Sequence, residues 1–162
     1  IQQRFDSGAI YLLQNAMQRT MSEGTGRSVY SQLPRSLALA GKTGTSNDSR
    51  DSWFAGFSQD VLAVVWLGRD DNGPTPLTGA TGALQVWTDF MRKADPLPLD
   101  MPVPDNVVQA WVDASSGQGT DPSCPNAVQM PYIRGSQPVA GPACGIQAPV
   151  NEVMDWVRGW LD

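Results

Sequence analysis

A run of prolines divides this chain and limits how far one packed core can extend. In the stretch "ADPLPLDMPVPD", residues 94–105, proline stands at nearly every second or third position. Proline fixes its own backbone angle and lacks a hydrogen-bond donor, so such a run favours extended backbone and ends the globular pattern. We therefore predict a first domain over residues 1–94 and a C-terminal extension over residues 95–162.

Two stretches before the proline run have the apolar spacing of amphipathic helices. The first extends from Ser7 to Met21, with Ser7 as a candidate N-cap, and the second extends from Thr81 to Lys93. Their apolar stripes comprise Ile10, Leu13, Met17 and Met21 in the first and Leu84, Trp87 and Met91 in the second. Each pattern predicts a helix that packs one face on protein.

Three short segments between the predicted helices have the composition of β-strands. They are rich in β-branched or aromatic residues and are separated by the polar stretches "SNDSRD" and "SQD". The segments are Leu37–Thr45, Ser52–Phe57 and Val61–Gly68. We predict consecutive antiparallel strands packed with helices, an α+β fold. Their aromatic residues are interpreted as core, as is the tryptophan of the second helix: Trp53, Phe54, Trp66 and Trp87.

The overall composition excludes several classes of function. The chain of 162 residues is 41% hydrophobic and 17% charged, which is typical of a globular protein. Its net charge is -5 and its 11 Lys and Arg residues are scattered, so we expect no nucleic-acid partner. The absence of histidine excludes His-based triads and His metal ligands, and no cofactor or metal site is indicated. The longest apolar run, Val61–Leu67, is far shorter than the roughly 20 residues that span a bilayer.

The C-terminal extension contains both cysteines of the chain. Cys124 and Cys144 lie in the Gly/Pro-rich stretches "TDPSCPNAV" and "VAGPACGIQ", which have few large apolar residues for packing. Two cysteines without further ligands do not make a zinc site. A disulfide in an oxidising compartment is favoured, with two free thiols as the alternative. Beyond them, the apolar spacing within residues 151–162 predicts an end helix that docks on protein, with a helix lying on a membrane surface as the alternative.

The stretch "LAGKTGTS", residues 39–46, has two possible interpretations. A phosphate-binding loop would need glycine where the chain has Ser36, and a helix after the lysine, where the sequence is rich in Gly, Ser, Asn and Asp. If the stretch is a strand, its period of two places Thr43 and Thr45 on one side. Two hydroxyls beside an exposed backbone suit an extended, peptide-like ligand with a carboxylate, to which Lys42 adds positive potential. An ordinary edge strand with a solvated lysine is the alternative.

A family resemblance favours the ligand-binding strand. Lys42-Thr43-Gly44-Thr45 is preceded by "EGTGR" and followed by "DSWFAGF", "VVWLGRDDN" and "GATGA". Together these motifs resemble the final third of the transpeptidase domain of a class A, bifunctional penicillin-binding protein, whose K-T-G element is shared with serine β-lactamases. The resemblance covers roughly Ser7 to Lys93. The cysteine-bracketed extension is similar to the 1B type of Gram-negative bacteria.

The resemblance implies roles for five neighbouring residues. Lys42 would shape the electrostatics of the site, and the backbone N–H of Thr45 would be one donor of the oxyanion hole. Substrate would be bound by Thr43, Gly44, Thr45 and Ser46. The implied fold is part of the serine transpeptidase and β-lactamase type, three-layered α/β in the parent protein, followed by a loop-rich extension tied by the disulfide.

The implied reaction needs residues that this chain does not contain. The family's nucleophile is a serine in S-x-x-K, assisted by an S-x-N motif. The residues three positions before the two lysines, Lys42 and Lys93, are Leu39 and Phe90, so S-x-x-K is missing. No Asn has a Ser two residues before it, so S-x-N is missing as well. We therefore expect the chain, which starts at Ile1, to be a C-terminal piece of a longer protein. The rest of the transpeptidase domain would then be its partner.

The resemblance also implies ligands and a location. The substrates would be peptidoglycan stem peptides, and β-lactam antibiotics would be inhibitors, with consequences for cell shape and antibiotic resistance. A regulatory lipoprotein or cell-division proteins would be partners, and the protein would work at the periplasmic face of the bacterial inner membrane, anchored outside this chain. Alternatives are a serine β-lactamase or D,D-carboxypeptidase relative, or a non-catalytic binding or scaffold module.

Overall fold

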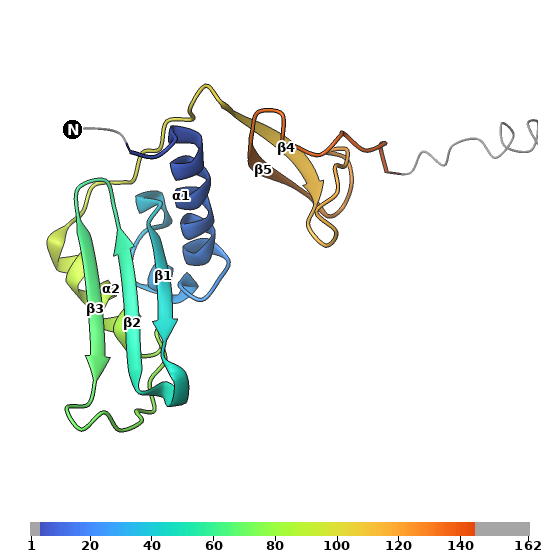
Figure 1. Ribbon diagram of the computed structural model, residues 1–162. Coiled ribbons are helices and arrows are strands. Elements are labelled where there is room, and N and C mark those ends of the chain that lie inside the picture. The colour runs from blue at the N-terminus through green and yellow to red at the C-terminus, as the bar shows by residue number, and fades with distance from the viewer. Residues whose placement is uncertain (1–3, 145–162) are drawn as a thin grey trace, which may run out of the picture. The chain divides into compact units, whose positions relative to one another are not determined.

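The chain has an α+β fold with antiparallel strands, as the sequence predicts. The computed structural model describes residues 4–144 (Figure 1). It forms two compact units, Ile1–Pro104 and Asp105–Asp162, which are described separately below. Within residues 4–144, no helix has the length and apolar character needed to cross a bilayer. The predicted end helix over residues 151–162 lies outside the described residues.

Helix α1 spans Ser7–Ser22, and its N-cap lies one residue earlier than the sequence suggested. The N-cap is Asp6 and not Ser7, because the Asp6 carboxylate accepts a hydrogen bond from the Ala9 N–H at 2.9 Å. Of its predicted apolar stripe, Met21 is fully buried, whereas Ile10 and Leu13 are 39% and 58% exposed. Only the C-terminal part of the stripe therefore belongs to the core.

The sheet of the first unit has the strand order β1-β2-β3. Strands β1 (Ala40–Thr45), β2 (Asp51–Phe57) and β3 (Leu62–Gly68) are consecutive and antiparallel, as predicted. The first strand starts later than predicted, because Ala38 adopts a left-handed conformation with φ of 48°. The connection between β2 and β3 is tight, with the Ser58 N–H donating to the Val61 carbonyl at 2.9 Å.

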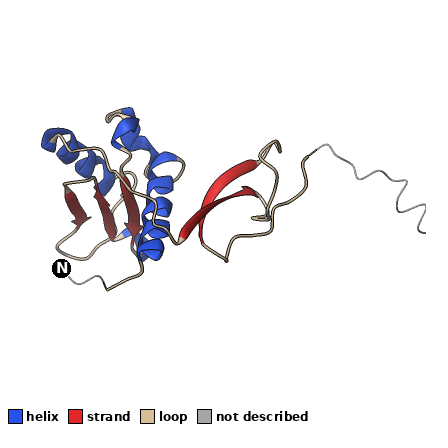
Figure 2. Ribbon diagram, turned by 90° about the horizontal axis from the view of Figure 1, so that it is seen from above, coloured by secondary structure: helices blue, strands red, loops and turns tan. Residues whose placement is uncertain are grey.

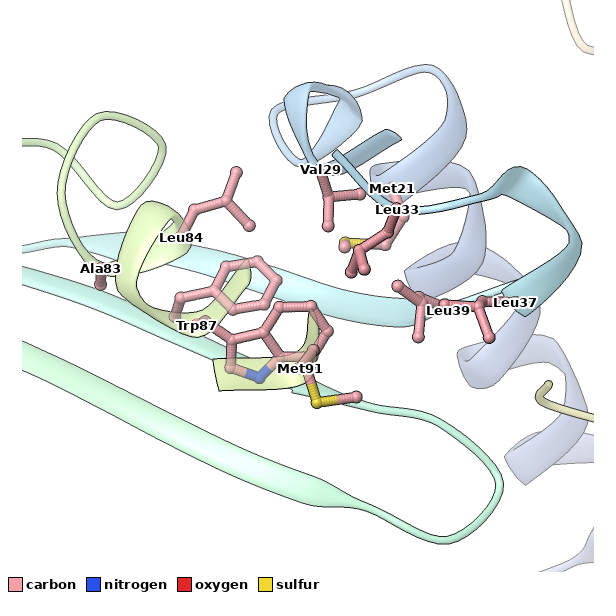
Figure 3. Packing of buried hydrophobic residues seen from close by; sticks show 10 residues of the cluster. Met21, Val29, Leu33, Leu37, Leu39, Ala83, Leu84, Trp87 and Met91 are labelled. Carbon is pink, nitrogen blue, oxygen red and sulfur yellow. The ribbon is translucent and has the colours of Figure 1, made fainter. Parts of the chain in front are cut away.

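A hydrophobic core lies between one face of this sheet and the helical segments. Figure 2 shows the helices along one side of the strands and beside the sheet edge. Helix α2, Ala83–Ala94, buries the predicted stripe completely, and the Trp87 ring meets Phe54 of β2 edge to face at 4.9 Å (Figure 3). The buried cluster comprises Met21, Val29, Leu33, Leu37, Leu39, Phe54, Ala83, Leu84, Trp87 and Met91.

Two tryptophans that were predicted as core residues lie instead on the opposite face of the sheet, where they are partly exposed. Trp53 and Trp66 stand opposite each other in the register of β2 and β3 and are 45% and 48% exposed. Their rings lie 6.2 Å apart, and the Trp66 indole N–H donates to Asp51 at 2.9 Å. From composition we predicted all four aromatic residues to be core. Among residues 4–144, however, helices cover only one face of the sheet, and Trp53 and Trp66 lie on the other.

The second unit contains two strands that the sequence analysis did not predict. Strands β4, Val107–Asp113, and β5, Ala127–Ile133, pair antiparallel. The predicted disulfide between Cys124 and Cys144 is present. In the same unit, two stretches of backbone pack directly, since a Cβ added at Gly119 would lie 1.9 Å from the Val139 carbonyl oxygen. The extension is therefore tied by a cross-link and by backbone contact.

Candidate functional site

Strand β1 carries the K-T-G-T motif along an edge of the sheet. Its register places Thr43 opposite Phe54 and Thr45 opposite Ser52, so both threonines share the helix-bearing face. Lys42 and Gly44 belong to the other face. The predicted alternation of the motif is therefore present in the structure.

The main-chain groups of the motif also alternate. Just past the strand, the Ser46 N–H donates to the Asp51 carbonyl at 3.1 Å. Hydrogen-bonded pairs alternate along an antiparallel ladder, so Gly44 turns its N–H and C=O toward β2. Thr43 and Thr45 turn theirs toward the outer edge, which pairs with no other strand among residues 4–144. This edge is open to an extended ligand.

The Thr43 hydroxyl belongs to a small polar group at this edge. It lies 2.7 Å from the hydroxyl of Thr25, which comes from the loop after α1. The Lys42 Nζ donates to the Thr43 carbonyl at 2.8 Å and lies 3.4 Å from the Thr43 hydroxyl. Among residues 4–144, Lys42 is exposed and forms no salt bridge. Its positive charge is therefore available along the edge of β1.

The Thr45 hydroxyl contacts the loop that leads into α2. It accepts a hydrogen bond from the buried Gly79 N–H at 3.0 Å. Gly44 has a different role, because a Cβ there would meet the Trp53 Cβ at 3.1 Å on the opposite face of the sheet. The missing side chain thus makes room for the neighbouring strand as well as leaving the edge bare.

Ser46 holds the turn between β1 and β2. Its hydroxyl accepts from the Asp51 N–H at 2.8 Å. The Trp66 indole N–H, followed by the Ser46 hydroxyl, holds the pKa of the Asp51 carboxyl below its ordinary value. The structure therefore places Ser46 next to the other motif residues, with its hydroxyl engaged at the end of the strand.

An open hollow of about 740 Å³ lies beside Thr25. Its wall combines the loop after α1 with the start of the α2 region, and it contains one acidic and one basic side chain, Glu23 and Arg27. The lining residues are Glu23, Gly24, Thr25, Arg27, Ser28, Ala80, Thr81 and Gln85. Among residues 4–144, no group of three or more Asp, Glu, His or Cys side chains could hold a metal ion.

Sequence reasoning assigned no role to Thr25, Ser52 or Gly79. All three lie in motifs that carried the resemblance, "EGTGR", "DSWFAGF" and "GATGA". The motifs were therefore a signal that more than the K-T-G element belongs to the site. Their contacts with the threonines of β1 span up to 34 residues of sequence, which local patterns do not reveal.

Comparison with known proteins identifies the family. Penicillin-binding protein 1B of Vibrio cholerae is 37% identical over 158 residues, which are 98% of this chain and 19% of that protein. This chain belongs to the class A penicillin-binding proteins. Penicillin-binding protein 1B of Haemophilus influenzae is 48% identical over 97 residues, or 60% of this chain and 12% of that protein. No family model matches the chain.

A solved structure supports the fold as well as the family. The crystal structure of penicillin-binding protein 1A from Haemophilus influenzae matches with a TM-score of 0.69 and 26% sequence identity. The match covers 80% of this chain and 20% of that chain. The matches therefore span between 12% and 20% of the length of these class A penicillin-binding proteins, to which the chain is related over most of its own length.

Proposed function

We propose that this chain forms one wall of the acyl-transfer site of a peptidoglycan D,D-transpeptidase. The observation that carries the proposal is edge strand β1, where Thr43 and Thr45 share one face and turn their main-chain groups to the open edge. An exposed sheet edge binds an extended peptide through main-chain hydrogen bonds. Kinship with class A penicillin-binding proteins supports a stem peptide as that ligand.

The proposed reaction is covalent acyl transfer. A serine hydroxyl from outside this chain attacks the carbonyl carbon between the two terminal D-alanines of a stem peptide. A C–O ester bond forms, the C–N bond breaks, and the leaving D-alanine takes a proton on its amine. The amine of a second stem peptide then attacks the ester, forms the cross-linking amide and returns a proton to the serine. A β-lactam acylates the same serine.

Each motif residue has a proposed part in this reaction. Lys42 supplies positive potential at the open edge, and the hydroxyls of Thr43 and Thr45 bind the terminal carboxylate of the donor peptide. The outward N–H of Thr45 stabilises the oxyanion of the tetrahedral intermediate. Gly44 and Ser46 complete the substrate-binding strand and its turn.

The remaining proposals concern the longer parent protein: its domains, its location and its partners. We propose that residues 1–94 belong to its transpeptidase domain and residues 95–162 to an extension. The serine of S-x-x-K and the S-x-N motif come from the rest of that domain. The protein acts at the periplasmic face of the inner membrane, where the disulfide is stable. A regulatory lipoprotein or cell-division proteins are its proposed partners.

Covalent labelling of the parent protein with a fluorescent penicillin tests the proposal. Lys42→Ala removes the charge at the open edge of β1, and we expect acylation to slow on the order of a hundredfold. The matched control is Lys93→Ala, which removes the other lysine of the chain, in the last turn of α2. The control should label at the parent's rate.

Two results would contradict the proposal. Near-normal labelling of Lys42→Ala would show that the edge of β1 does not face the reacting serine. Covalent labelling of the 162-residue chain by itself would show that the nucleophile lies within it. A test for hydrolysed penicillin in the same experiment separates a transpeptidase from a β-lactamase relative.

A further inference from the structure

The loop Thr78–Gly82 lies directly against the motif strand. The Gly79 N–H donates to the Thr45 hydroxyl oxygen, and a Cβ added at Gly79 would lie 2.7 Å from the Gly44 carbonyl oxygen and 2.6 Å from that of Trp53. A side chain at this position would push the loop off the strand. The close approach of this N–H to Thr45 therefore requires glycine.

A buried serine fixes both ends of this loop. Ser52 is fully buried and stands opposite Thr45 in the register of β1 and β2. Its hydroxyl donates to the Thr78 carbonyl at 2.7 Å and accepts from the Ala83 N–H, the first residue of α2, at 2.9 Å. One hydroxyl thus ties the start of the loop to the start of the helix, while Gly79 between them reaches Thr45.

The contact with Gly79 determines whether the Thr45 hydroxyl acts as a hydrogen-bond acceptor or as a donor at the site. A threonine hydroxyl has one hydrogen to donate and lone pairs that accept. Since Gly79 N–H occupies a lone pair, the hydroxyl keeps its own hydrogen for another acceptor, and it donates to no group among residues 4–144. A carboxylate is the acceptor that gains most from such a donor, because charged acceptors form the stronger hydrogen bonds.

We propose that Ser52 and Gly79 are positioning residues that set the Thr45 hydroxyl as a donor to the substrate carboxylate. This inference rests on the proposed function of Thr45 and adds the parts that orient it. Neither residue touches the substrate. Ser52 acts through the loop, and Gly79 acts through its N–H.

The test uses the full-length parent protein and two probes that differ only in the carboxylate. The second-order acylation rate is measured with benzylpenicillin and with its methyl ester. Ser52→Ala should lower the rate about tenfold with the acid and leave the rate with the ester within about twofold. Ser58→Ala is the matched control, since Ser58 is also a buried serine whose hydroxyl accepts from a backbone N–H, at the other end of β2.

A double mutant separates positioning from general damage. In the Thr45→Val background, Ser52→Ala should have no further effect on the acid, because the hydroxyl that it orients is gone. Equal slowing of acid and ester by Ser52→Ala, or a full additional loss in the Thr45→Val background, would overturn the inference. Normal acylation of Thr45→Val by the acid would instead remove the Thr45 hydroxyl from the proposed function itself.

The folding of each variant is checked by its Tm before the rates are compared. If Ser52→Ala does not yield folded protein, Ser52→Cys replaces it, since a thiol of similar size donates and accepts only weakly. For this variant too, a ratio of the acid rate to the ester rate that falls below that of the parent supports the positioning role. A ratio equal to that of the parent in a folded variant would contradict the positioning role.

Discussion

In the unit Ile1–Pro104, ten buried residues gather in one cluster against the sheet (Figure 3). In Asp105–Asp162, the buried apolar side chains among the described residues are Val107, Val112 and Cys124. Such a small core contributes little apolar burial, and small units of this kind depend on covalent ties. The disulfide and the contact of Gly119 with the Val139 backbone are therefore expected to hold the second unit.

Removal of a core tryptophan should have the largest effect. Trp87→Ala deletes a fully buried side chain that packs on Phe54, so we expect the first unit to lose about 3–5 kcal/mol of unfolding free energy. Urea unfolding followed by far-UV circular dichroism measures this loss. Phe90→Ala is the control on the same helix, because Phe90 is 47% exposed. Equal losses for both variants would contradict the assignment of the core.

Removal of the disulfide should affect the second unit alone. Replacing Cys124 and Cys144 by serine opens a closed loop with a sequence separation of 20 residues. We expect the region of β4 and β5 to lose about 2–4 kcal/mol. Hydrogen exchange read by mass spectrometry should show faster exchange in these strands and unchanged exchange in β1 to β3. Faster exchange in both regions would mean that the first unit also depends on the cross-link.

Two glycines of the second unit separate the cost of a steric clash with neighbouring backbone from the cost of a left-handed backbone angle. Gly119→Ala places a Cβ against main-chain atoms that no rotamer change can move, so we expect a loss of about 1–3 kcal/mol in the second unit. Gly135→Ala is the comparison, because Gly135 has φ of 93° and no atom within 4 Å of the added Cβ. Its loss should be nearer 1 kcal/mol, from the left-handed backbone alone. The reverse order, measured by urea unfolding, would show that the contact at Gly119 is not tight.

The first unit was largely predictable from sequence because its patterns report burial directly. The spacing of Leu84, Trp87 and Met91 predicted both a helix and its buried face, and the β-branched and aromatic composition of Val61–Gly68 predicted the strand that the structure has at Leu62–Gly68. The exposed positions were less predictable. Trp53 and Trp66 are as apolar as core residues, and only the arrangement of the helices shows that, within residues 4–144, no helix covers their face of the sheet.

The second unit and the support of the site were not predictable for different reasons. Strand β5 contains Pro131, which weakens a strand pattern, and a long Gly/Pro-rich connection rather than a short turn separates it from β4. At the site, the K-T-G-T motif was enough to predict the strand and the shared face of its two threonines. The bonds of Ser52 to Thr78 and Ala83 join residues 26 and 31 positions apart, which only the folded chain brings together.

The smallest expected effect is on the pKa values of two carboxyl groups, one in each unit. Arg69 and then the Gly73 N–H lower the pKa of Asp71 to about 2, whereas hydroxyl and N–H donors of Ser115 and Ser116 lower that of Asp113 to about 2. Each folded pKa lies below the ordinary value of about 3.9, so each carboxylate stabilises the folded state above about pH 4. That contribution is lost as the pH falls toward 2.

The cause of each shift can be separated by salt and by mutation. Arg69 binds Asp71 through two N–H groups, at 2.8 and 2.7 Å, so part of its effect is an exposed charge interaction that salt screens. In 1 M NaCl we expect the pKa of Asp71 to rise and that of Asp113 to stay, as followed by NMR titration of the carboxyl carbons. Arg69→Gln should likewise raise only the pKa of Asp71. A parallel rise at Asp113 would mean that net charge, and not the local donors, sets both values.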